Sequence, residues 1–224
     1  MESGRLRQTF TEELEQLRIQ VELMAVRVDQ NLERMRVVLV DGSVELLAVA
    51  FHADDEIDDM NVSLTERCYH LLRREAPVAS DLRFVVSVLR VLGELERIGD
   101  LGLRVIKLAP DHALLASNPP TFDILIAMAD HVVERYRDAL RAWATMDLAL
   151  ATDLAAASRS MDAYYERLMS ELLRLEGPDA VRVAVVTFTA GRSIERIGDH
   201  AGIIGARLRY LLTGDPAHLN AEVR

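Results

Sequence analysis

The feature that most constrains this chain is a spacing of apolar residues that occurs twice. Each time, the apolar positions alternate steps of four and three residues. That spacing places side chains along one narrow face of an α-helix, as in the seam of a coiled coil. It predicts an all-α fold of long, packed helices. The first seam consists of Phe10, Leu14, Leu17, Val21, Met24, Val28, Met35 and Val38, with Asn31 in its one polar position; the second consists of Phe122, Ile126, Ala129, Val133, Tyr136, Leu140 and Trp143.

Turn-forming residues divide the chain into six predicted helices. Asp41-Gly42 ends the first helix, and Pro77 separates the second from the third. The segment 110–120 holds three of the six prolines and is predicted to be a linker. Asp147 can cap a fifth helix, which Gly177-Pro178 ends. The predicted organisation is a three-helix bundle at 1–109, the linker at 110–120, a similar three-helix bundle at 121–214 and a C-terminal tail at 215–224.

Composition and charge exclude several classes of protein. The chain has 26 Lys and Arg against 36 Asp and Glu, a formal net charge of −10, which argues against binding to a nucleic-acid backbone. The single cysteine, Cys68, excludes internal disulfides and multi-thiolate metal sites. The first residues are charged throughout, and no stretch of about eighteen apolar residues follows. We therefore expect a cytoplasmic protein that reaches a membrane only through its partners.

An identical pentapeptide, Glu-Arg-Ile-Gly-Asp, occurs at Glu96–Asp100 and again at Glu195–Asp199. Each copy places two carboxylates one helical turn apart, where like charges repel by a few tenths of a kcal/mol. Each copy also places a glycine inside a helix, at a cost of about 1 kcal/mol relative to alanine. The exact repeat indicates a duplicated domain whose motif carries a function that offsets these costs.

Counting from the helix connections predicts which residues face the pentapeptides. Residues equally far from the turn lie at the same height in an antiparallel pair, and the turns are expected near Pro77 and Pro178. The count places two acids of the second helix level with the first pentapeptide. It places one acid and one serine of the fifth helix level with the second. The predicted layers are Asp55, Asp59, Glu96 and Asp100 in the first half, and Asp162, Glu195 and Asp199 in the second, with Ser158 where the first has an acid.

Carboxylates brought together in this way must be neutralised by protonation, by arginine or by a metal ion. Arg97, Arg192 and Arg196 are available for ion pairs, which is the simplest explanation for any single pair of acids. The repeated motif and the matched heights favour metal. All-oxygen ligands suit Mg²⁺, Mn²⁺ or Fe, and zinc is less natural without thiolates. His200 points about 100° away from Asp199 around the helix and is expected at a surface or an interface.

Three strings in this sequence closely resemble the PhoU family, the accessory and regulatory proteins of bacterial phosphate-specific transport. They are Pro77–Arg83, Glu94–Asp100 and Arg192–His200, and the resemblance extends over nearly the whole chain. It implies two similar three-helix bundles whose acidic motifs hold multinuclear metal clusters of iron or zinc. The implied metal ligands are the seven acids of the two layers above. Ser158 departs from the family pattern, because a hydroxyl binds a hard cation more weakly than a carboxylate.

The resemblance also implies a function. It is negative regulation of the phosphate-starvation response, by a non-enzymatic adaptor between the ATPase subunit of the phosphate transporter and a sensor histidine kinase. A homodimer is expected on the same ground. These partners follow from the resemblance alone, and composition and spacing say nothing of them.

Two other interpretations stay open at this point. A ferritin-like metalloenzyme or metal-storage bundle also places carboxylates inside a helical bundle, but it needs Glu-x-x-His motifs, which the chain lacks. A purely structural adaptor would pair the acids with arginine and bind no metal. Phosphoryl transfer through a P-loop is excluded, because Lys107 is the only lysine and no glycine-rich loop precedes it.

Overall fold

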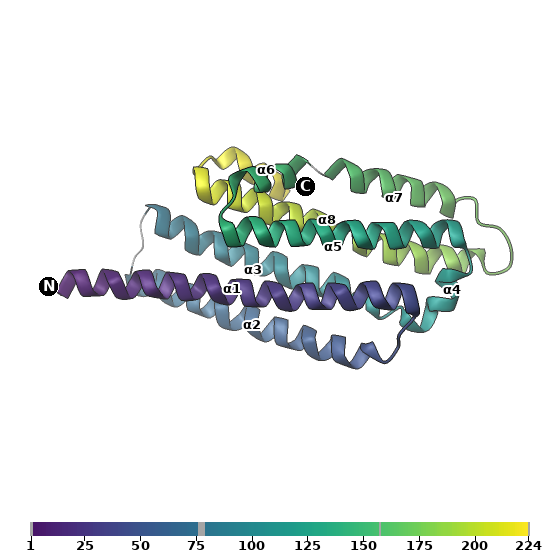
Figure 1. Ribbon diagram of the computed structural model, residues 1–224, viewed down its shortest axis with the longest axis horizontal. Coiled ribbons are helices and arrows are strands. Elements are labelled where there is room, and N and C mark those ends of the chain that lie inside the picture. Colours follow the sequence, from purple (N-terminus) through teal and green to yellow (C-terminus); the bar gives the residue numbers. More distant parts are fainter. Residues whose placement is uncertain (1, 76–78, 157, 224) are drawn as a thin grey trace.

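The computed structural model describes residues 2–75, 79–156 and 158–223, and side chains within 8–74, 80–154 and 160–220. Every regular element in those ranges is a helix, which confirms the all-α prediction (Figure 1). The elements are α1 Glu2–Asp41, α2 Leu46–Glu75, α3 Ala79–Ile106, η1 Ala109–Asp111, α4 His112–Ala116, α5 Pro119–Thr145, α6 Leu148–Ala156, α7 Ser158–Leu172, α8 Ala180–Thr213 and η2 Pro216–Val223.

Two sets of helices lie side by side along the length of the molecule. The set α1, α2 and α3 packs against the set α5, α6, α7 and α8, with α1 against α5 and α3 against α8 (Figure 1). The most extensive helix–helix contact in the molecule is between α3 and α8. Buried apolar residues of both sets form one continuous core. The two predicted bundles therefore share one core.

The segment predicted as a linker is largely helical. The short helices η1 and α4 occupy its first half, and α5 already begins at Pro119. Asn118 caps α5, because its side chain accepts a hydrogen bond from the Thr121 backbone N–H at 3.2 Å. The predicted fifth helix is described as α6 and α7, with residue 157 outside the description. As predicted, Asp147 caps its start by accepting the backbone N–H of Ala149 at 2.8 Å.

The seam of α1 is buried as its spacing predicts. Leu17, Val21, Met24, Val28, Met35 and Val38 are at most 2% exposed. Asn31 is fully buried in the polar position of this seam, and its Nδ2 donates to the Ala50 carbonyl oxygen of α2 at 3.4 Å. This polar contact fixes the height of α2 against α1, because a slip would leave a buried amide without a partner.

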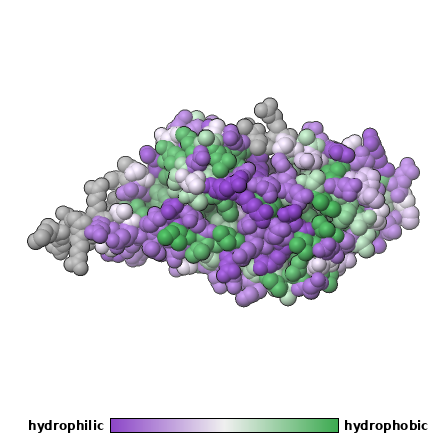
Figure 2. All heavy atoms as spheres, in the orientation of Figure 1, coloured by the Kyte–Doolittle hydropathy of each residue, from purple (hydrophilic) through white to green (hydrophobic). Residues whose placement is uncertain are grey.

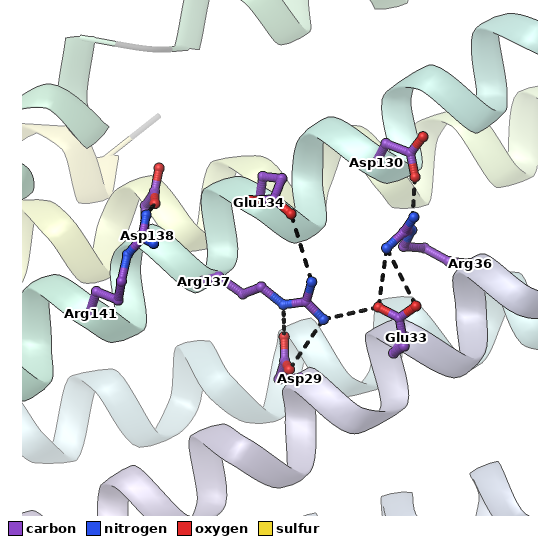
Figure 3. Close-up of polar contacts among 8 residues, drawn as sticks. All are labelled: Asp29, Glu33, Arg36, Asp130, Glu134, Arg137, Asp138 and Arg141. Carbon is purple, nitrogen blue, oxygen red and sulfur yellow. Dashed lines mark hydrogen bonds and ion pairs between the residues drawn. The ribbon is translucent and has the colours of Figure 1, made fainter.

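Polar contacts join α1 to α5. The hydroxyl of the fully buried Tyr136 donates to the Ala25 carbonyl oxygen at 2.8 Å. At the surface, Arg137 bridges Asp29 at 2.8 Å and Glu33 at 2.9 Å (Figure 3). Because the ion pairs are half-exposed, each contributes at most about 1 kcal/mol. Their main effect is to fix the register of two helices that belong to different repeats.

Among the described helices, none combines enough length with enough apolar residues to cross a bilayer.

The α1–α2 turn requires glycine at position 42. Gly42 has φ of +69°, and a Cβ placed on it would lie 2.7 Å from the imidazole Cγ of His112 in α4. The carbonyl oxygen of Val40 is 3.1 Å from Nε2 of the same imidazole, so the ring cannot easily move away. Both the backbone conformation and the packing therefore exclude a side chain.

We predict that Gly42→Ala lowers the free energy of unfolding by about 2 kcal/mol, from left-handed strain and contact with the His112 ring. Gly93→Ala is the matched control. Gly93 lies inside α3 with no heavy atom within 4 Å of a built Cβ, so the alanine should stabilise by up to about 1 kcal/mol. Urea unfolding of the two variants measures both effects. Equal stability of the two would contradict the assignment of Gly42.

Candidate functional site

The two pentapeptides lie on α3 and α8, the helix pair with the largest contact in the molecule. Near them the helices are joined by a buried polar contact, in which Nδ1 of His200 lies 2.6 Å from Oε2 of Glu94. The two side chains are 5% and 15% exposed. His200 is thus at an interface, as predicted, and it faces the other repeat instead of the acids of its own.

In the first repeat, four acids face one another between α2 and α3. Burial raises the pKa of Asp54 to about 6, with Asp100 and Asp58 acting in the same direction. Burial also raises the pKa of Asp58 and of Glu96, and in both cases the charge of Asp100 adds to the effect. Within the described residues, none of the four forms an ion pair with an arginine. This layer therefore holds mutually repelling carboxylates.

The structure differs from the sequence prediction by one residue along α2. Asp54 and Asp58 are the α2 acids whose pKa is raised by the charge of Asp100 on α3. Asp55 and Asp59, the residues predicted, are exposed, as Asp58 also is. A Cβ built on Gly99 would lie 3.5 Å from Oδ1 of Asp54. Counting from the turn gives the height of a residue to within about one position, and one position is 100° around a helix. The predicted acids of α2 therefore lie at the correct height along the helix, but one position away from the acids that interact with Asp100.

The second repeat arranges its acids differently, because an arginine lies among them. Arg135 of α5 is 6% exposed, and its Nη2 donates to the Leu154 carbonyl oxygen at 2.9 Å. Burial lowers the pKa of this guanidinium, while the charges of Asp199 and Asp162 raise it. The acids of this layer therefore have a cation supplied by the protein.

Glu195, the third acid of the second layer, also has a basic partner. Its carboxylate forms an ion pair with Arg192, one turn earlier on α8. Burial raises the pKa of Glu195, and the charge of Arg192 opposes that rise. The side chain of Ser158, the predicted departure from the acidic pattern, lies outside the described residues.

A pair of matching hydrogen bonds shows which residues of the two repeats correspond. Asn31 donates to the carbonyl oxygen of Ala50, and Arg135 donates to that of Leu154; each acceptor follows its donor by 19 residues. Asn31 therefore corresponds to Arg135. Four residues after each acceptor the sequence has Asp54 in one repeat and Ser158 in the other, and eight residues after each it has Asp58 and Asp162.

The same correspondence shows that the apolar seam of α5 differs from the predicted one. The residues equivalent to the α1 seam come one position before the predicted ones, and all are buried: Thr121, Leu125, Met128, Val132, Arg135, Ala139 and Ala142. The predicted seam is also largely buried, at Ala129, Val133, Tyr136 and Trp143, because α5 is covered on two sides. Arg135 was missed for this reason. A signal for it existed, since Arg135 is the one charged residue of the second seam and holds the position equivalent to Asn31.

The glycines of the pentapeptides are not required by close packing. A Cβ on Gly99 or on Gly198 would have its nearest neighbours at 3.5 Å, an ordinary contact distance. Glycine inside a helix costs stability relative to alanine, and the packing around Gly99 and Gly198 does not explain why glycine occupies these positions.

Comparison with known proteins identifies the family. A family model described as the PhoU domain matches residues 21–109 and 125–208, one match for each repeat. This chain belongs to the PhoU family. The PhoU homolog of Pseudomonas putida is 30% identical over 218 residues, covering 96% of this chain and 85% of the relative. The phosphate-specific transport system accessory protein PhoU of Escherichia coli strain K12 is 28% identical, covering 95% of this chain and 89% of the relative.

Two solved PhoU structures share the architecture. PhoU from Pseudomonas aeruginosa superimposes with a TM-score of 0.86 at 31% identity, covering 92% of this chain and 100% of that one. The phosphate transport system regulatory protein PhoU from Streptococcus pneumoniae has a TM-score of 0.83 at 25% identity, covering 92% and 98%. These names describe accessory and regulatory proteins, so the prediction of a non-enzymatic PhoU member is confirmed. The ferritin-like alternative has no support among them.

The acids of the first repeat fit a hard cation by their chemistry. They supply four carboxylates, and burial together with the charge of Asp100 raises the pKa of the other three. Among the described residues, no three His, Cys, Asp or Glu side chains are arranged to hold an ion as they stand. The second repeat fits a cation poorly, because Arg192 pairs with Glu195 and the buried guanidinium of Arg135 lies within the electrostatic reach of Asp162 and Asp199.

We predict a pH dependence from Asp54 in metal-free protein. Its folded-state pKa of about 6 lies above the ordinary value of 3.8, so the folded state binds the proton more tightly. Asp54 therefore stabilises the fold as pH falls from about 7 to 4 and opposes it once ionised. Asp54→Asn, with chelator present, should raise the free energy of unfolding at pH 8 by about 1 kcal/mol, since water screens the partly exposed group.

Urea unfolding at pH 8 and pH 4.5 measures this difference. At pH 4.5 the gain should vanish, because Asp54 is then already protonated in the folded state. The control is Asp55→Asn, the exposed neighbour, which should change stability little at either pH. If the gain belonged to Asp55→Asn instead, the facing residues would be those that the sequence predicted.

Proposed function

We propose that this chain regulates phosphate uptake and phosphate-starvation signalling, as an adaptor between the phosphate transporter's ATPase subunit and a sensor histidine kinase. The observation that carries the proposal is the match of both repeats to the PhoU domain, together with similarity over 95% of the chain to phosphate-specific transport accessory proteins. Such an accessory protein associates with the transport system. The finer assignment of two partners, and of a cytoplasmic homodimer, is part of the proposal.

The surface supports a protein that binds other proteins. Along one face, hydrophobic patches alternate with hydrophilic areas (Figure 2). An apolar groove of about 310 Å³ lies between α7 and α8, where Val185 and Phe188 are 59% and 43% exposed. Exposed apolar surface of this kind is typical of interaction sites. This exposed apolar surface supports an adaptor, which must bind partner proteins at its surface.

For the metal sites, the proposal differs between the repeats. Asp54, Asp58, Glu96 and Asp100 would hold a hard cation in the first repeat, because four carboxylates lie together with no arginine ion pair. The ion would supply the positive charge that relieves their repulsion. Asp58 and Asp100 are exposed, so they can change rotamer on binding at little cost. In the second repeat, Arg135 supplies that charge instead, and Asp162, Glu195 and Asp199 would bind no ion.

We predict that Glu96→Ala with Asp100→Ala loses the bound metal, and that Asp162→Asn with Asp199→Asn keeps it. Protein purified without chelator is analysed by inductively coupled plasma mass spectrometry, with helicity checked by circular dichroism. Metal that disappears with the second pair and stays with the first would contradict the asymmetry.

A gain-of-function variant makes the metal proposal sharper. Arg135→Asn with Ser158→Asp gives the second repeat the residues of the first, which are Asn31 and Asp54 at the corresponding positions. It should bind additional metal, because it removes the internal cation and adds a carboxylate. Arg135→Asn alone is the control. If neither the wild type nor this variant contained metal, the metal proposal would be wrong and the acids would have only a structural role.

We predict for the regulatory role that deleting the gene raises expression of phosphate-responsive genes in phosphate-rich medium, measured by transcript sequencing. Affinity capture from phosphate-replete cells should recover a transporter ATPase or a histidine kinase. Complementation with the Glu96→Ala, Asp100→Ala variant then separates the two proposals, since it tests whether regulation needs the first acidic layer. Unchanged expression after deletion and no such partner on capture would remove the regulatory role.

A further inference from the structure

A cavity of about 370 Å³ lies between α3 and α8, where the two pentapeptide helices meet. Four arginines line it, two from each helix: Arg97 and Arg104 of α3, and Arg192 and Arg196 of α8. Asp100 is the one carboxylate in the lining. Two acids lie next to lining residues: Glu195 pairs with Arg192, and Glu94 lies against His200. The positive charge of this cavity therefore exceeds its negative charge.

The duplication explains why guanidinium groups gather here. Arg97 and Arg196 are the second residues of the two identical pentapeptides. The Glu94–His200 contact and the shared lining show that α3 and α8 run antiparallel at this point, since early residues of one motif helix meet late residues of the other. The packing of the two repeats thus brings one motif arginine from each into a single cavity.

Three of these arginines have no acid within ion-pair distance among the described residues. Arg18, Arg36 and Arg137 each pair with two or more acids. By contrast, Arg97, Arg104 and Arg196 form no ion pair or hydrogen bond within the described part of the chain. The fourth arginine of the cavity, Arg192, pairs with Glu195. In a chain of net charge −10, what distinguishes these arginines is that they converge on one cavity.

A tetrahedral oxyanion is the ligand class that this lining fits. Guanidinium groups present planar forks of N–H donors that match phosphate oxygens in pairs. Ser193 adds a small polar side chain to the wall. The cavity volume is far above that of a single water, so an anion and its remaining hydration fit. Four arginines around the cavity favour an anion over a metal ion at its centre.

We propose that this cavity is a binding site for a phosphate-class oxyanion, held by Arg97, Arg104 and Arg196 and shared between the two repeats. The site goes beyond the adaptor function and does not depend on it. It shares Asp100 with the proposed cation site, so the test below uses metal-free protein. Because the donors come from both helices, a bound oxyanion would add attraction between α3 and α8.

The test is equilibrium dialysis of the full chain against radiolabelled inorganic phosphate, with chelator present and at constant low ionic strength. We expect saturable binding of one phosphate per chain. Arg97→Gln with Arg196→Gln should weaken it at least tenfold, and Asp100→Asn should strengthen it by removing the opposing carboxylate. The matched control, Arg174→Gln with Arg182→Gln, loses the same charge at exposed positions outside the cavity and should stay within twofold.

Two further arms complete the experiment. Competition with pyrophosphate and with O-phosphoserine distinguishes free phosphate from a phosphoryl group on a larger molecule, and either result supports the site. If Arg97→Gln with Arg196→Gln does not fold, Arg104→Gln alone, an exposed residue, replaces it. The proposal fails if wild type binds no phosphate, or if the cavity variant and the control lose binding equally. Because chelated protein is used, a missing metal site cannot produce either failure.

Discussion

The packing of α3 against α8 is the contact on which the rest of this molecule depends. It joins the two repeats into one core. A buried polar contact between Glu94 and His200 links the two helices. A buried polar contact of this kind tolerates little slip, because losing the partner leaves a charged or polar group without solvent. The same packing brings the two motif arginines into one cavity and leaves the acidic layers on the outer sides, against α2 and α7. The distribution of charge across the molecule thus follows from one helix–helix interface.

The repeats kept their architecture and diverged in charge. At the equivalent polar position of the first helix, one has Asn31 and the other Arg135, and both bind a carbonyl oxygen of the next helix. At corresponding positions in the sequence of the next helix, the first repeat has Asp54 and the second has Ser158. Both exchanges act in the same direction, because one removes an acid and the other adds a base. The first layer is left with uncompensated carboxylates, and the second is neutralised from within. This asymmetry is the physical basis for assigning different roles to two sites that began as copies.

Membership of the PhoU family indicates the process in which the protein acts, whereas the arginine-lined cavity concerns the ligand that it binds. The family match covers both repeats and fixes the kind of process, which is the regulation of phosphate transport in its relatives. The cavity belongs to this chain's own side chains and concerns what the protein binds directly. An oxyanion held between α3 and α8 would act at the interface that joins the repeats. The cavity also touches both acidic layers, because Asp100 of the first layer lines it and Arg192 of its wall pairs with Glu195 of the second.

The sequence by itself determined the all-α fold, the duplication and the height of each acidic layer, because helical spacing and an exact repeat are properties of the chain alone. It also determined the family, through motifs that survive at about 30% identity. Tertiary structure decided which face each residue presents: Asp54 and Asp58 instead of Asp55 and Asp59, and a second seam one position earlier, containing Arg135. The physical reason is that one residue is only 1.5 Å of helix but 100° of rotation. Height therefore follows from counting, whereas orientation is set by packing against helices that are distant in sequence.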